Sequence, residues 1–517
     1  MSDARTSPST PDLKSPTVQV LGLIVLFVLL RLITSRFVGL GTDESYSVAV
    51  ARDLHLSYFD HPPMQYWLVH AIAPLVGYGR GGRLPFIALF AGSSWLMFVL
   101  TRRLFGEAAG VWAVLGLNLS AFFTFAAGSW VLPDGPLIFF LLGAATALAR
   151  LWFSTPSEAS RPWASWLTLG VWIGLAALSK YQAALFCVGI AAAIATVSHR
   201  RGQLAHPAPY AAALLSLLIL SPVLIWNAHH GWASFAFQAG RGAPGHKPHP
   251  LGPVVALAAQ AVLLLPWVFW PMARASIGAA RAGLGAERGW FCLMLAAPAI
   301  AVFTLMPLLS PLGLPHWSMP GWLFLFPLLG ERLAAAVAAD RRWPKAWLIF
   351  AALFVLAGGA LAVFDAATGW AGAAWPTLFK RGDPTAETLE WTPVRVALEQ
   401  RGRLGATLPR PLLIAPQWNE AGKLDEAVGG EATVMVFSPD QREFAFRHDA
   451  KAFVGHDALI VGKLDTLNKR LPELRGYFHD VATGPPIAVG RDGRRELTIG
   501  VIEAHDLLRP YPQGGKP

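Results

Sequence analysis

Long apolar segments separated by short polar linkers dominate the first 365 residues of the chain. Each segment is about 20 residues long, which is the length that an α-helix needs to cross the hydrocarbon core of a bilayer. We therefore predict roughly eleven membrane-spanning helices. Their expected ranges are 18–38, 84–101, 107–127, 135–153, 163–179, 181–198, 207–226, 251–272, 290–309, 318–338 and 345–364.

The pattern changes after residue 365, where charged residues become dense and apolar runs become short. Short apolar runs of this kind are typical of strands. We predict strands at 411–415, 432–437, 457–462 and 496–504, and helices at 418–427 and 464–474. Residues 366–517 are therefore expected to form a small α/β domain, and the polar residues 1–17 a disordered cytoplasmic tail.

Composition agrees with an α-helical polytopic membrane protein. The 517 residues are 54% hydrophobic and 14% charged, with a mean hydropathy of +0.44, so a soluble domain could not bury the apolar surface. The net charge of +10 does not indicate nucleic-acid binding, because Lys and Arg gather in short clusters between apolar segments. Cys187 and Cys292 both fall within apolar segments, and no disulfide framework follows from them.

The basic clusters also predict how the chain is oriented. Arg102, Arg200 and Arg341 lie in linkers on one side, which the positive-inside rule makes cytoplasmic. The other side holds the loops 39–83 and 226–250, which carry acidic and aromatic residues. An odd number of spans from a cytoplasmic N-terminus places the C-terminal domain outside. We therefore expect a multi-pass protein of the bacterial inner membrane with a periplasmic C-terminal domain.

The loop 39–83 predicts an active site. Asp43 and Glu44 follow the first apolar segment directly, at a membrane face where carboxylates are solvated and lipid headgroups are within reach. A carboxylate in this position also suits a helix cap, which is the structural alternative. Because two adjacent acids are followed by tyrosines, we interpret Asp43 and Glu44 as catalytic candidates. Tyr46, Tyr58 and His61 follow as candidate substrate contacts.

Further candidates lie in the other loops of the same face. Asp134 stands in a proline-bracketed turn, where it can act in catalysis or cap a helix. Lys180 ends a span on the side where the positive-inside rule disfavours lysine, so it can hold a phosphate rather than snorkel, and Tyr181 beside it is a further candidate substrate contact. Arg241 lies beside aromatic residues and suits a bidentate phosphate contact. His316 is expected to close the same cavity, with an interfacial aromatic belt as the alternative.

No cofactor is certain from the sequence, and a divalent metal stays open as an alternative. The loop 226–250 contains four histidines, but they lack regular ligand spacing, so a divalent metal is not indicated. These are His229, His230, His246 and His249.

Several stretches resemble one family of membrane enzymes. GTDESYSVAVARDL, SYFDHPPMQYWL, RLPFIALFAG and WVLPDGPLIFF, followed by LSKYQ and WNAHHGWASFAFQ, are similar to the protein O-mannosyltransferase and lipid A aminoarabinose transferase (ArnT-like) group. HWSMPGWLFLFPLLG matches more loosely. The resemblance implies a GT-C fold and a sugar donor carried on polyprenyl phosphate.

The same resemblance implies residue roles. Asp43 matches the acid of the first external loop, and Asp134 the second acid. Tyr58, Lys180 and Arg241 match contacts to the carrier phosphate. The chain departs from the aminoarabinose transferases at Asp60 and His61, where those enzymes typically have Glu-Lys. A titratable side chain replaces a fixed cation there, which argues against assuming an aminoarabinose substrate.

Together these observations predict a glycosyltransferase that moves a sugar from a polyprenyl-phosphate donor to an acceptor at the periplasmic face, with inversion. The acceptor class stays open among lipid A or lipopolysaccharide, another envelope glycan or lipid, and a protein. Asp43 is expected to deprotonate the acceptor, while Lys180, Arg241 and His61 neutralise the departing phosphate. The alternative is a transporter or flippase of a lipid-linked sugar, which should show matched halves.

Overall fold

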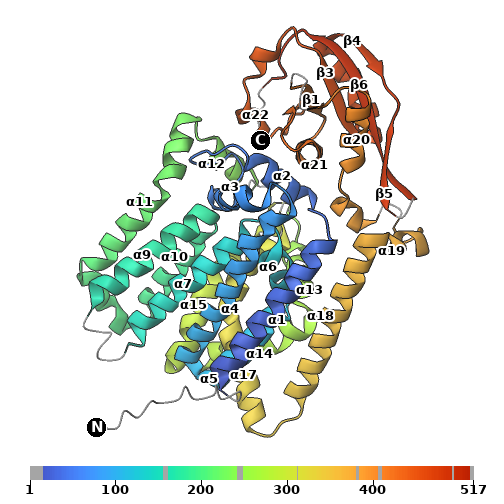
Figure 1. Cartoon of the computed structure of the whole chain (residues 1–517). Helices are drawn as coiled ribbons and strands as arrows, with labels where there is room; N and C mark the ends of the chain where they lie inside the picture. The colour runs from blue at the N-terminus through green and yellow to red at the C-terminus, as the bar shows by residue number, and fades with distance from the viewer. Residues whose placement is uncertain are drawn as a thin grey trace, which may run out of the picture.

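The computed structural model describes residues 15–154, 161–241, 248–310, 313–379, 383–405, 410–491 and 494–512. It consists of a bundle of long helices and a smaller domain containing a sheet, which lies at the end of the bundle opposite the start of α1 (Figure 1). The predicted fold class, an α-helical polytopic membrane protein with a small C-terminal α/β domain, is confirmed. Of the predicted tail, residues 1–14 lie outside the described residues, and α1 already begins at Pro16.

The bundle is built from long helices joined by short linkers. Its longer helices are α1 (Pro16–Phe37), α4 (Leu84–Phe105), α5 (Glu107–Asn118), α7 (Asp134–Trp152), α9 (Pro162–Ser179), α10 (Ala183–Thr196), α11 (Ala208–His229), α13 (Gly252–Leu264), α14 (Pro266–Ala282), α15 (Glu287–Leu305), α17 (Phe326–Ala338) and α18 (Trp343–Thr368), and the short helices α6 (Ala127–Ser129) and α16 (Met319–Trp322) lie between them.

Fewer helices qualify as complete spans than the hydropathy pattern predicts. Among the described residues, eight are long and apolar enough to cross a membrane, or up to ten if each of two sharply bent pairs counts as one span. The predicted span 251–272 is divided at Leu265, whose φ is +74°. The break leaves α13 with 13 residues, too short to cross alone. Pro266 follows Leu265 and lacks the amide that would continue the helix.

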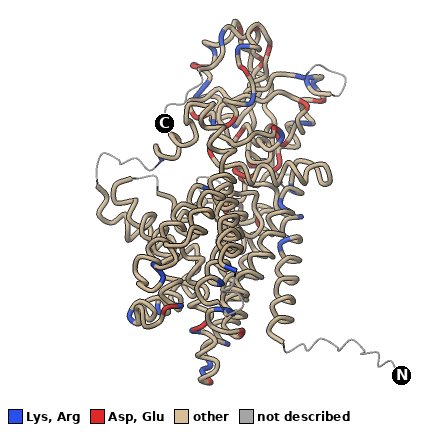
Figure 2. The backbone as a smooth tube through the Cα atoms, turned by 90° about the vertical axis from the view of Figure 1, so that its left-hand side faces the viewer, with Lys and Arg blue, Asp and Glu red and all other residues tan. Residues whose placement is uncertain are grey.

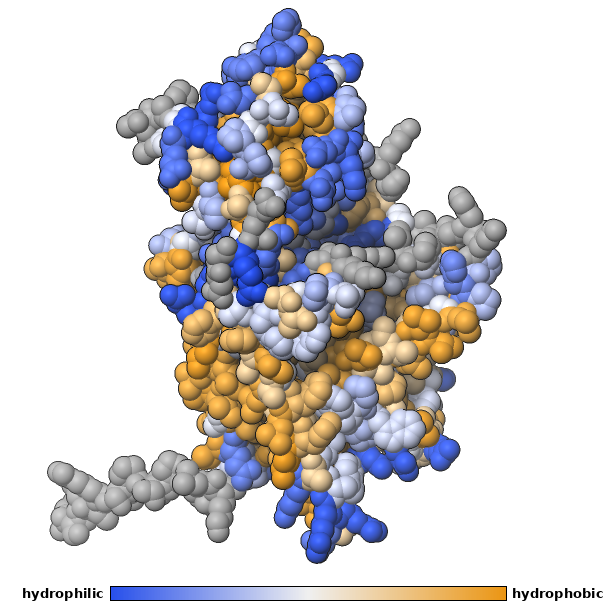
Figure 3. All heavy atoms as spheres, turned by 90° about the vertical axis from the view of Figure 1, so that its right-hand side faces the viewer, coloured by the Kyte–Doolittle hydropathy of each residue, from blue (hydrophilic) through white to orange (hydrophobic). Residues whose placement is uncertain are grey.

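The outer surface of the bundle is apolar. Figure 3 shows an apolar belt below the more hydrophilic C-terminal domain, with hydrophilic residues again at the far end. Large side chains such as Leu29, Leu218 and Leu353 are more than half exposed on α1, α11 and α18. A soluble protein does not leave so much apolar area uncovered, whereas lipid covers it without cost. The protein is therefore a multi-pass membrane protein.

Charged residues lie mainly at the two ends of the molecule. Figure 2 shows Lys and Arg gathered at the end of the bundle remote from the C-terminal domain, with the middle of the bundle almost uncharged. At that end Arg200 pairs with Glu287 at 2.9 Å.

The C-terminal domain contains a mixed sheet in the order β2-β1-β3-β6-β4, with β5 also paired to β6. The strands β1, β2 and β3 are parallel, whereas β6 runs antiparallel to its neighbours. Its elements are α19 (Trp370–Ala374), α20 (Thr392–Gln400), β1 (Leu412–Ala415), α21 (Trp418–Val428), β2 (Thr433–Val436), α22 (Phe444–Arg447), β3 (Ala458–Lys463), α23 (Leu464–Leu474), β4 (Phe478–Thr483), β5 (Ile487–Arg491) and β6 (Arg494–Leu507).

Two short helices, α2 (Thr42–Val50) and α3 (Met64–Val76), lie between the bundle and this domain (Figure 1). Helix α21 packs directly on α2, because a Cβ on Gly422 would lie 2.6 Å from the backbone nitrogen of Tyr46. Glu426 accepts a 2.6 Å hydrogen bond from Ser45, and Arg52 pairs with Asp425 at 2.7 Å. The C-terminal domain thus fixes the position of the acidic loop.

Candidate active site

The adjacent acids of α2 have different environments, and Glu44 is held by the protein. Its carboxylate accepts hydrogen bonds from Nε of Arg83 at 2.8 Å and from the amides of Gly41 and Val131, both at 3.0 Å. Burial would raise the pKa of Glu44, but the Arg83 guanidinium and the amides of Gly41 and Val131 together outweigh burial, and the pKa is lowered. Glu44 was predicted to be catalytic; in this structure its oxygens are occupied, and it joins α2, the start of α4 and the turn before α7.

Asp43, one residue earlier, faces open space instead. Its side chain is exposed to a cavity of about 450 Å³, and among the described residues no side chain pairs with its carboxylate. Removal from bulk water raises the pKa of Asp43, and the charge of Arg442 only partly opposes the rise. The carboxylate is therefore both accessible and more basic than an ordinary aspartate, which suits a general base.

Asp60 lies at the centre of a buried hydrogen-bond network. The hydroxyls of Tyr46 and Tyr66 donate to its Oδ1 at 3.0 and 3.1 Å, and Arg442 approaches its Oδ2 at 3.5 Å. The amide of Glu443 in turn donates to the Tyr46 hydroxyl oxygen at 3.1 Å. The Tyr46 hydroxyl thus already donates its proton to Asp60 within the protein. It has no further proton to donate to a substrate, as the predicted contact would require.

The hydroxyl of Tyr58, which was predicted to contact the phosphate, is likewise hydrogen-bonded within the protein. Tyr58 is fully buried, its hydroxyl donates to the carbonyl of Asp53 at 2.9 Å, and the amide of His55 donates to it at 3.2 Å. We therefore assign Tyr58 to the support of the loop rather than to the carrier phosphate.

Asp134 and Lys180 form a buried ion pair. Nζ of Lys180 donates to both carboxylate oxygens of Asp134, at 2.9 and 3.0 Å. Asp134 begins α7, and Lys180 is the residue directly after α9. His61 and His316 both lie close enough to this pair to feel its charges. The structure therefore brings four of the sequence-predicted residues together.

Arg241 ends α12 (Ala233–Arg241) next to this group. Its guanidinium lies 4.7 Å from the centre of the Trp317 ring, and no carboxylate pairs with it in the described part of the chain. Burial, and then the charge of Arg442, lower its pKa. Helix α12 is held against the acidic loop, because Nε2 of Gln238 donates to the carbonyl of Asp60 at 2.5 Å. An unpaired guanidinium held by aromatic rings suits an incoming anion.

His61 and Tyr181 complete the predicted set. Burial lowers the pKa of His61 to about 4, and its Nδ1 is buried with no hydrogen-bond partner among the described residues. His61 is therefore neutral at pH 7 in the ligand-free protein. The hydroxyl of Tyr181 lies 2.6 Å from that of Ser234, which links the end of α9 to α12.

Arg442 lies in the same charged group but is not among the residues that the sequence predicts. It comes from the C-terminal domain, stacks 3.7 Å above the Trp418 ring and has a left-handed backbone with φ +49°. Such a backbone costs a residue with a side chain about 1–3 kcal/mol, which is typical of functional positions. A signal existed, because residues 438–443 follow the carboxyl end of parallel strand β2, where α/β domains commonly bind ligands.

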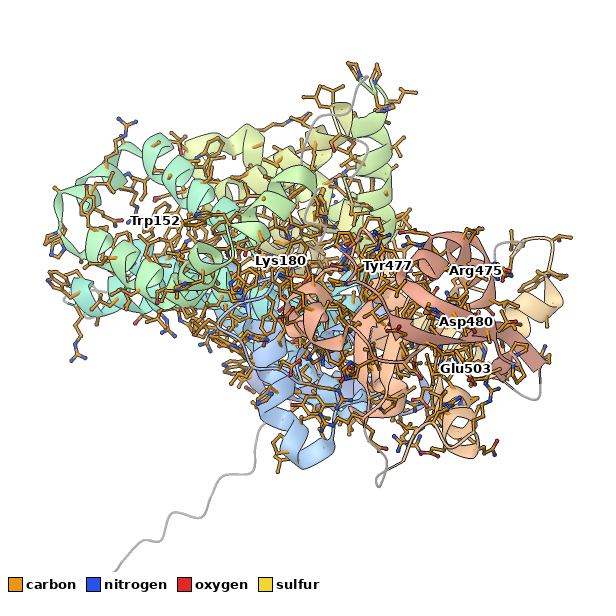
Figure 4. All side chains as sticks on the ribbon, turned by 90° about the horizontal axis from the view of Figure 1, so that it is seen from above. Trp152, Lys180, Arg475, Tyr477, Asp480 and Glu503 are labelled. Carbon is orange, nitrogen blue, oxygen red and sulfur yellow. The ribbon has the colours of Figure 1, made fainter. Side chains whose placement is uncertain are left out.

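The site lies where the bundle meets the C-terminal domain. Seen from above, Lys180 is near the middle of the molecule, while Arg475, Asp480 and Glu503 lie on the far side of that domain (Figure 4). Among the described residues, no three His, Cys, Asp or Glu side chains converge as metal ligands. The histidines of the loop 226–250 form no such group there, and His246 lies outside the described residues.

Comparison with solved structures now shows the fold. ArnT from Cupriavidus metallidurans, in a crystal structure bound to undecaprenyl phosphate, superposes with a TM-score of 0.61. The alignment covers 93% of this chain and 98% of that chain at 17% identity. The chain has the GT-C fold. The resemblance seen in the motifs is therefore confirmed at the level of the fold.

Two further comparisons agree with this fold. The Archaeoglobus fulgidus oligosaccharyltransferase tethered with an acceptor peptide has a TM-score of 0.51 and 13% identity, over 93% of this chain and 74% of that chain. Residues 60–226 match the family described as Dolichyl-phosphate-mannose-protein mannosyltransferase. No curated protein sequence matches the chain.

Proposed function

We propose that this protein is a glycosyltransferase that moves a sugar from a polyprenyl-phosphate carrier to a hydroxyl acceptor at the membrane face that carries Asp43. One observation carries the proposal: among the described residues, Asp43 is an unpaired carboxylate with a raised pKa that faces a cavity, and the guanidinium of Arg241 is an unpaired cation in the same charged group. A general base and an anion site are the two elements that transfer from a phosphate-linked sugar requires.

The reaction follows from these two elements. Asp43 takes the proton of the acceptor hydroxyl, whose oxygen forms a bond to the anomeric carbon of the sugar. The bond between that carbon and the carrier phosphate breaks, and its electron pair leaves with the phosphate. Arg241 stabilises the charge that develops there, and His61 offers a hydrogen bond. A single displacement inverts the anomeric carbon.

Asp134 and Lys180 have a different part in this scheme. Because their charges cancel, Lys180 brings little net charge to the phosphate, and the pair mainly fixes the ends of α7 and α9 beside the site. Asp134, which the sequence predicts as a catalytic residue, positions the Lys180 ammonium in this scheme. An ammonium proton of Lys180 can then turn to a phosphate oxygen when the donor binds.

The comparisons support the nature of the donor. The ArnT structure contains undecaprenyl phosphate, and the matching family is described by dolichyl-phosphate-mannose. A transporter or flippase of lipid-linked sugars is not favoured, since both named relatives of this fold are transferases.

The cellular location is part of the proposal. We place the protein in a bacterial inner membrane, with Asp43 and the C-terminal domain in the periplasm, because Arg102, Arg200 and Arg341 lie at or just beyond helix ends away from that domain. Fusions of a periplasmic reporter and a cytoplasmic reporter after residue 517 test this orientation. A silent periplasmic reporter together with an active cytoplasmic one would reverse it.

Analysis of a deletion strain tests the function. Mass spectrometry of its polyprenyl phosphates and envelope components should show sugar-loaded carrier accumulating and one sugar missing from an acceptor. The wild-type gene should restore both, and Asp43→Asn should restore neither. If the deletion changes neither the carrier pool nor any acceptor, the proposed function is wrong.

A further inference from the structure

The residues that line the cavity at Asp43 differ from those expected to bind the donor phosphate. Helices α1 and α18 and the segment after α19 form the walls of this cavity, through Val38, Gly358, Val363 and Thr385 among others. Lys180, Arg241, His316 and Arg442 do not line it. Asp43 therefore faces this cavity while its carboxylate also feels the charges of Arg442 and Asp60.

The cavity is polar at one end and apolar at the other. Its polar end carries Asp43, Thr385, Glu387 and Thr388. Its apolar walls come from two segments. The second half of α18 contributes Gly358, Gly359, Ala362 and Val363, and the segment before α7 contributes Phe125, Trp130 and Leu132. Gly358 lies about 15 Å below the end of α18, at 1.5 Å per residue. That depth is within the hydrocarbon layer for a helix that spans the membrane.

The flanks of the cavity face lipid. Ile33 and Phe37 on α1 and Leu361 and Phe364 on α18 are each more than half exposed. The two helices that line the cavity therefore also present apolar side chains to lipid beside it.

The charges of the polar end exclude the donor phosphate and favour hydroxyl groups. Asp43 and Glu387 would repel a phosphate, and Arg83, which also lines the cavity, is neutralised by Glu44. Carboxylate, hydroxyl and carbonyl oxygens accept hydrogen bonds from uncharged hydroxyls. The anion-binding groups and the hydroxyl-binding groups thus meet at Asp43, which is the arrangement that a transfer between two substrates needs.

We propose that this cavity binds the acceptor, and that the acceptor is a membrane amphiphile: a hydroxyl of its polar headgroup lies at Asp43, and its apolar part lies between α1 and α18. The inference rests on the proposed function. In the reaction the headgroup hydroxyl gives its proton to Asp43, its oxygen bonds to the sugar, and the bond from sugar to carrier phosphate breaks.

Gly358 provides a direct test. A Cβ at this position meets no atom within 4 Å, so a side chain can enter the cavity without a clash with the fold. Gly278 on α14 has equally open surroundings but does not line the cavity, which makes it the matched control. Gly359 is unsuitable, because its Cβ would meet the Phe125 ring at 3.3 Å.

The measurement uses the deletion strain complemented with wild type, Gly358→Ala, Gly358→Leu or Gly278→Leu. Envelope lipids and glycolipids are separated from proteins by organic extraction, and sugar additions and sugar-loaded carrier are quantified by mass spectrometry. We expect wild type to add the sugar to an extracted amphiphile. Gly358→Leu should lower this product by about tenfold or more and let sugar-loaded carrier accumulate. Gly358→Ala and Gly278→Leu should behave as wild type.

Two results would overturn the inference and leave the proposed function intact: wild type adding the sugar to a protein without a lipid anchor, or Gly358→Leu giving the full wild-type level of product. Failure of wild type to consume sugar-loaded carrier at all would instead contradict the proposed function. A Gly358→Leu protein that does not reach the membrane is replaced by Gly358→Val, for which the same product loss, smaller in size, is expected.

Discussion

Nζ of Lys180 donates hydrogen bonds of 2.9 and 3.0 Å to the two carboxylate oxygens of Asp134, and both side chains are buried. The pair joins the start of α7 to the end of α9 at the edge of the site. The sequence suggests an acid and a phosphate-binding cation with separate tasks. Their pairing makes them one unit, and leaves Arg241 as the unpaired cation of this group among the described residues.

The first prediction concerns this pair. Asp134→Asn and Lys180→Met should each lower the stability by about 3–5 kcal/mol, because each leaves its partner buried and unpaired. Asp134→Leu combined with Lys180→Met should recover much of that stability while transfer stays low. Thermal unfolding in detergent and a transfer assay on the same preparations measure both effects. Single variants that unfold at the wild-type temperature would show that the pair does not form.

Glu44 should act on stability rather than on chemistry. Folding lowers its pKa, so its contribution is fully present above the unfolded value of about 4.3 and is lost as the pH falls through the lower folded value. Glu44→Gln should therefore unfold at a lower temperature than wild type at pH 7, and the difference should shrink only as the pH falls below the unfolded value towards the lower folded one. Unfolding curves at pH 7 and at a series of pH values below the unfolded value check this. An unchanged unfolding curve at pH 7 would show that the ion pair between Glu44 and Arg83 does not stabilise the protein.

Much of the fold is visible in the sequence, because apolar spans and short strands have strong local signals. The four predicted strands correspond to β1, β2, β3 and β6. The strands β4 and β5 escape detection, since their residues are largely exposed or alternate without a strong apolar run. The break at Leu265 escapes as well, because hydropathy does not report a left-handed residue inside an apolar segment.

The candidate site is only partly visible. Motifs identify Asp43, Lys180 and Arg241 by type and position, but they do not show which of two adjacent acids is free. That depends on Arg83 and on the amide of Val131, which are distant in sequence. The contribution of Arg442 is likewise a tertiary contact between two domains, and its position after a predicted strand does not show that it reaches Asp60.

Arg442 should set the pH at which Asp43 becomes active. Its charge lowers the pKa of Asp43, so Arg442→Gln should raise that pKa further and move the acidic limb of the rate profile to higher pH. Arg475→Gln is the matched control, since Arg475 lies in the same domain on the side away from Lys180 (Figure 4). Rates measured from pH 4 to 8 compare the three proteins. Coinciding acidic limbs for wild type and Arg442→Gln would show that Arg442 does not act on Asp43.

His61 should change its protonation when the carrier binds. Burial holds its pKa at about 4 in the free protein, and a phosphate beside the imidazole would raise it. Titration of labelled histidine by NMR, with and without undecaprenyl phosphate, should show this rise. In the transfer assay His61→Gln should be slower, and His61→Lys should flatten the alkaline limb. If His61→Gln keeps both the rate and the profile of wild type, His61 belongs to the scaffold.

The central claim is that Asp43 is the base that activates the acceptor. The most direct measurement is a single-turnover transfer assay in liposomes made from envelope lipids of the deletion strain, which contain the accumulated sugar-loaded carrier. Wild type, Asp43→Asn and Glu44→Gln are compared at equal amounts of folded protein. Asp43→Asn should fold normally and lose roughly a hundredfold or more of the rate, while folded Glu44→Gln keeps most of it. Transfer by Asp43→Asn at nearly the wild-type rate would contradict the account.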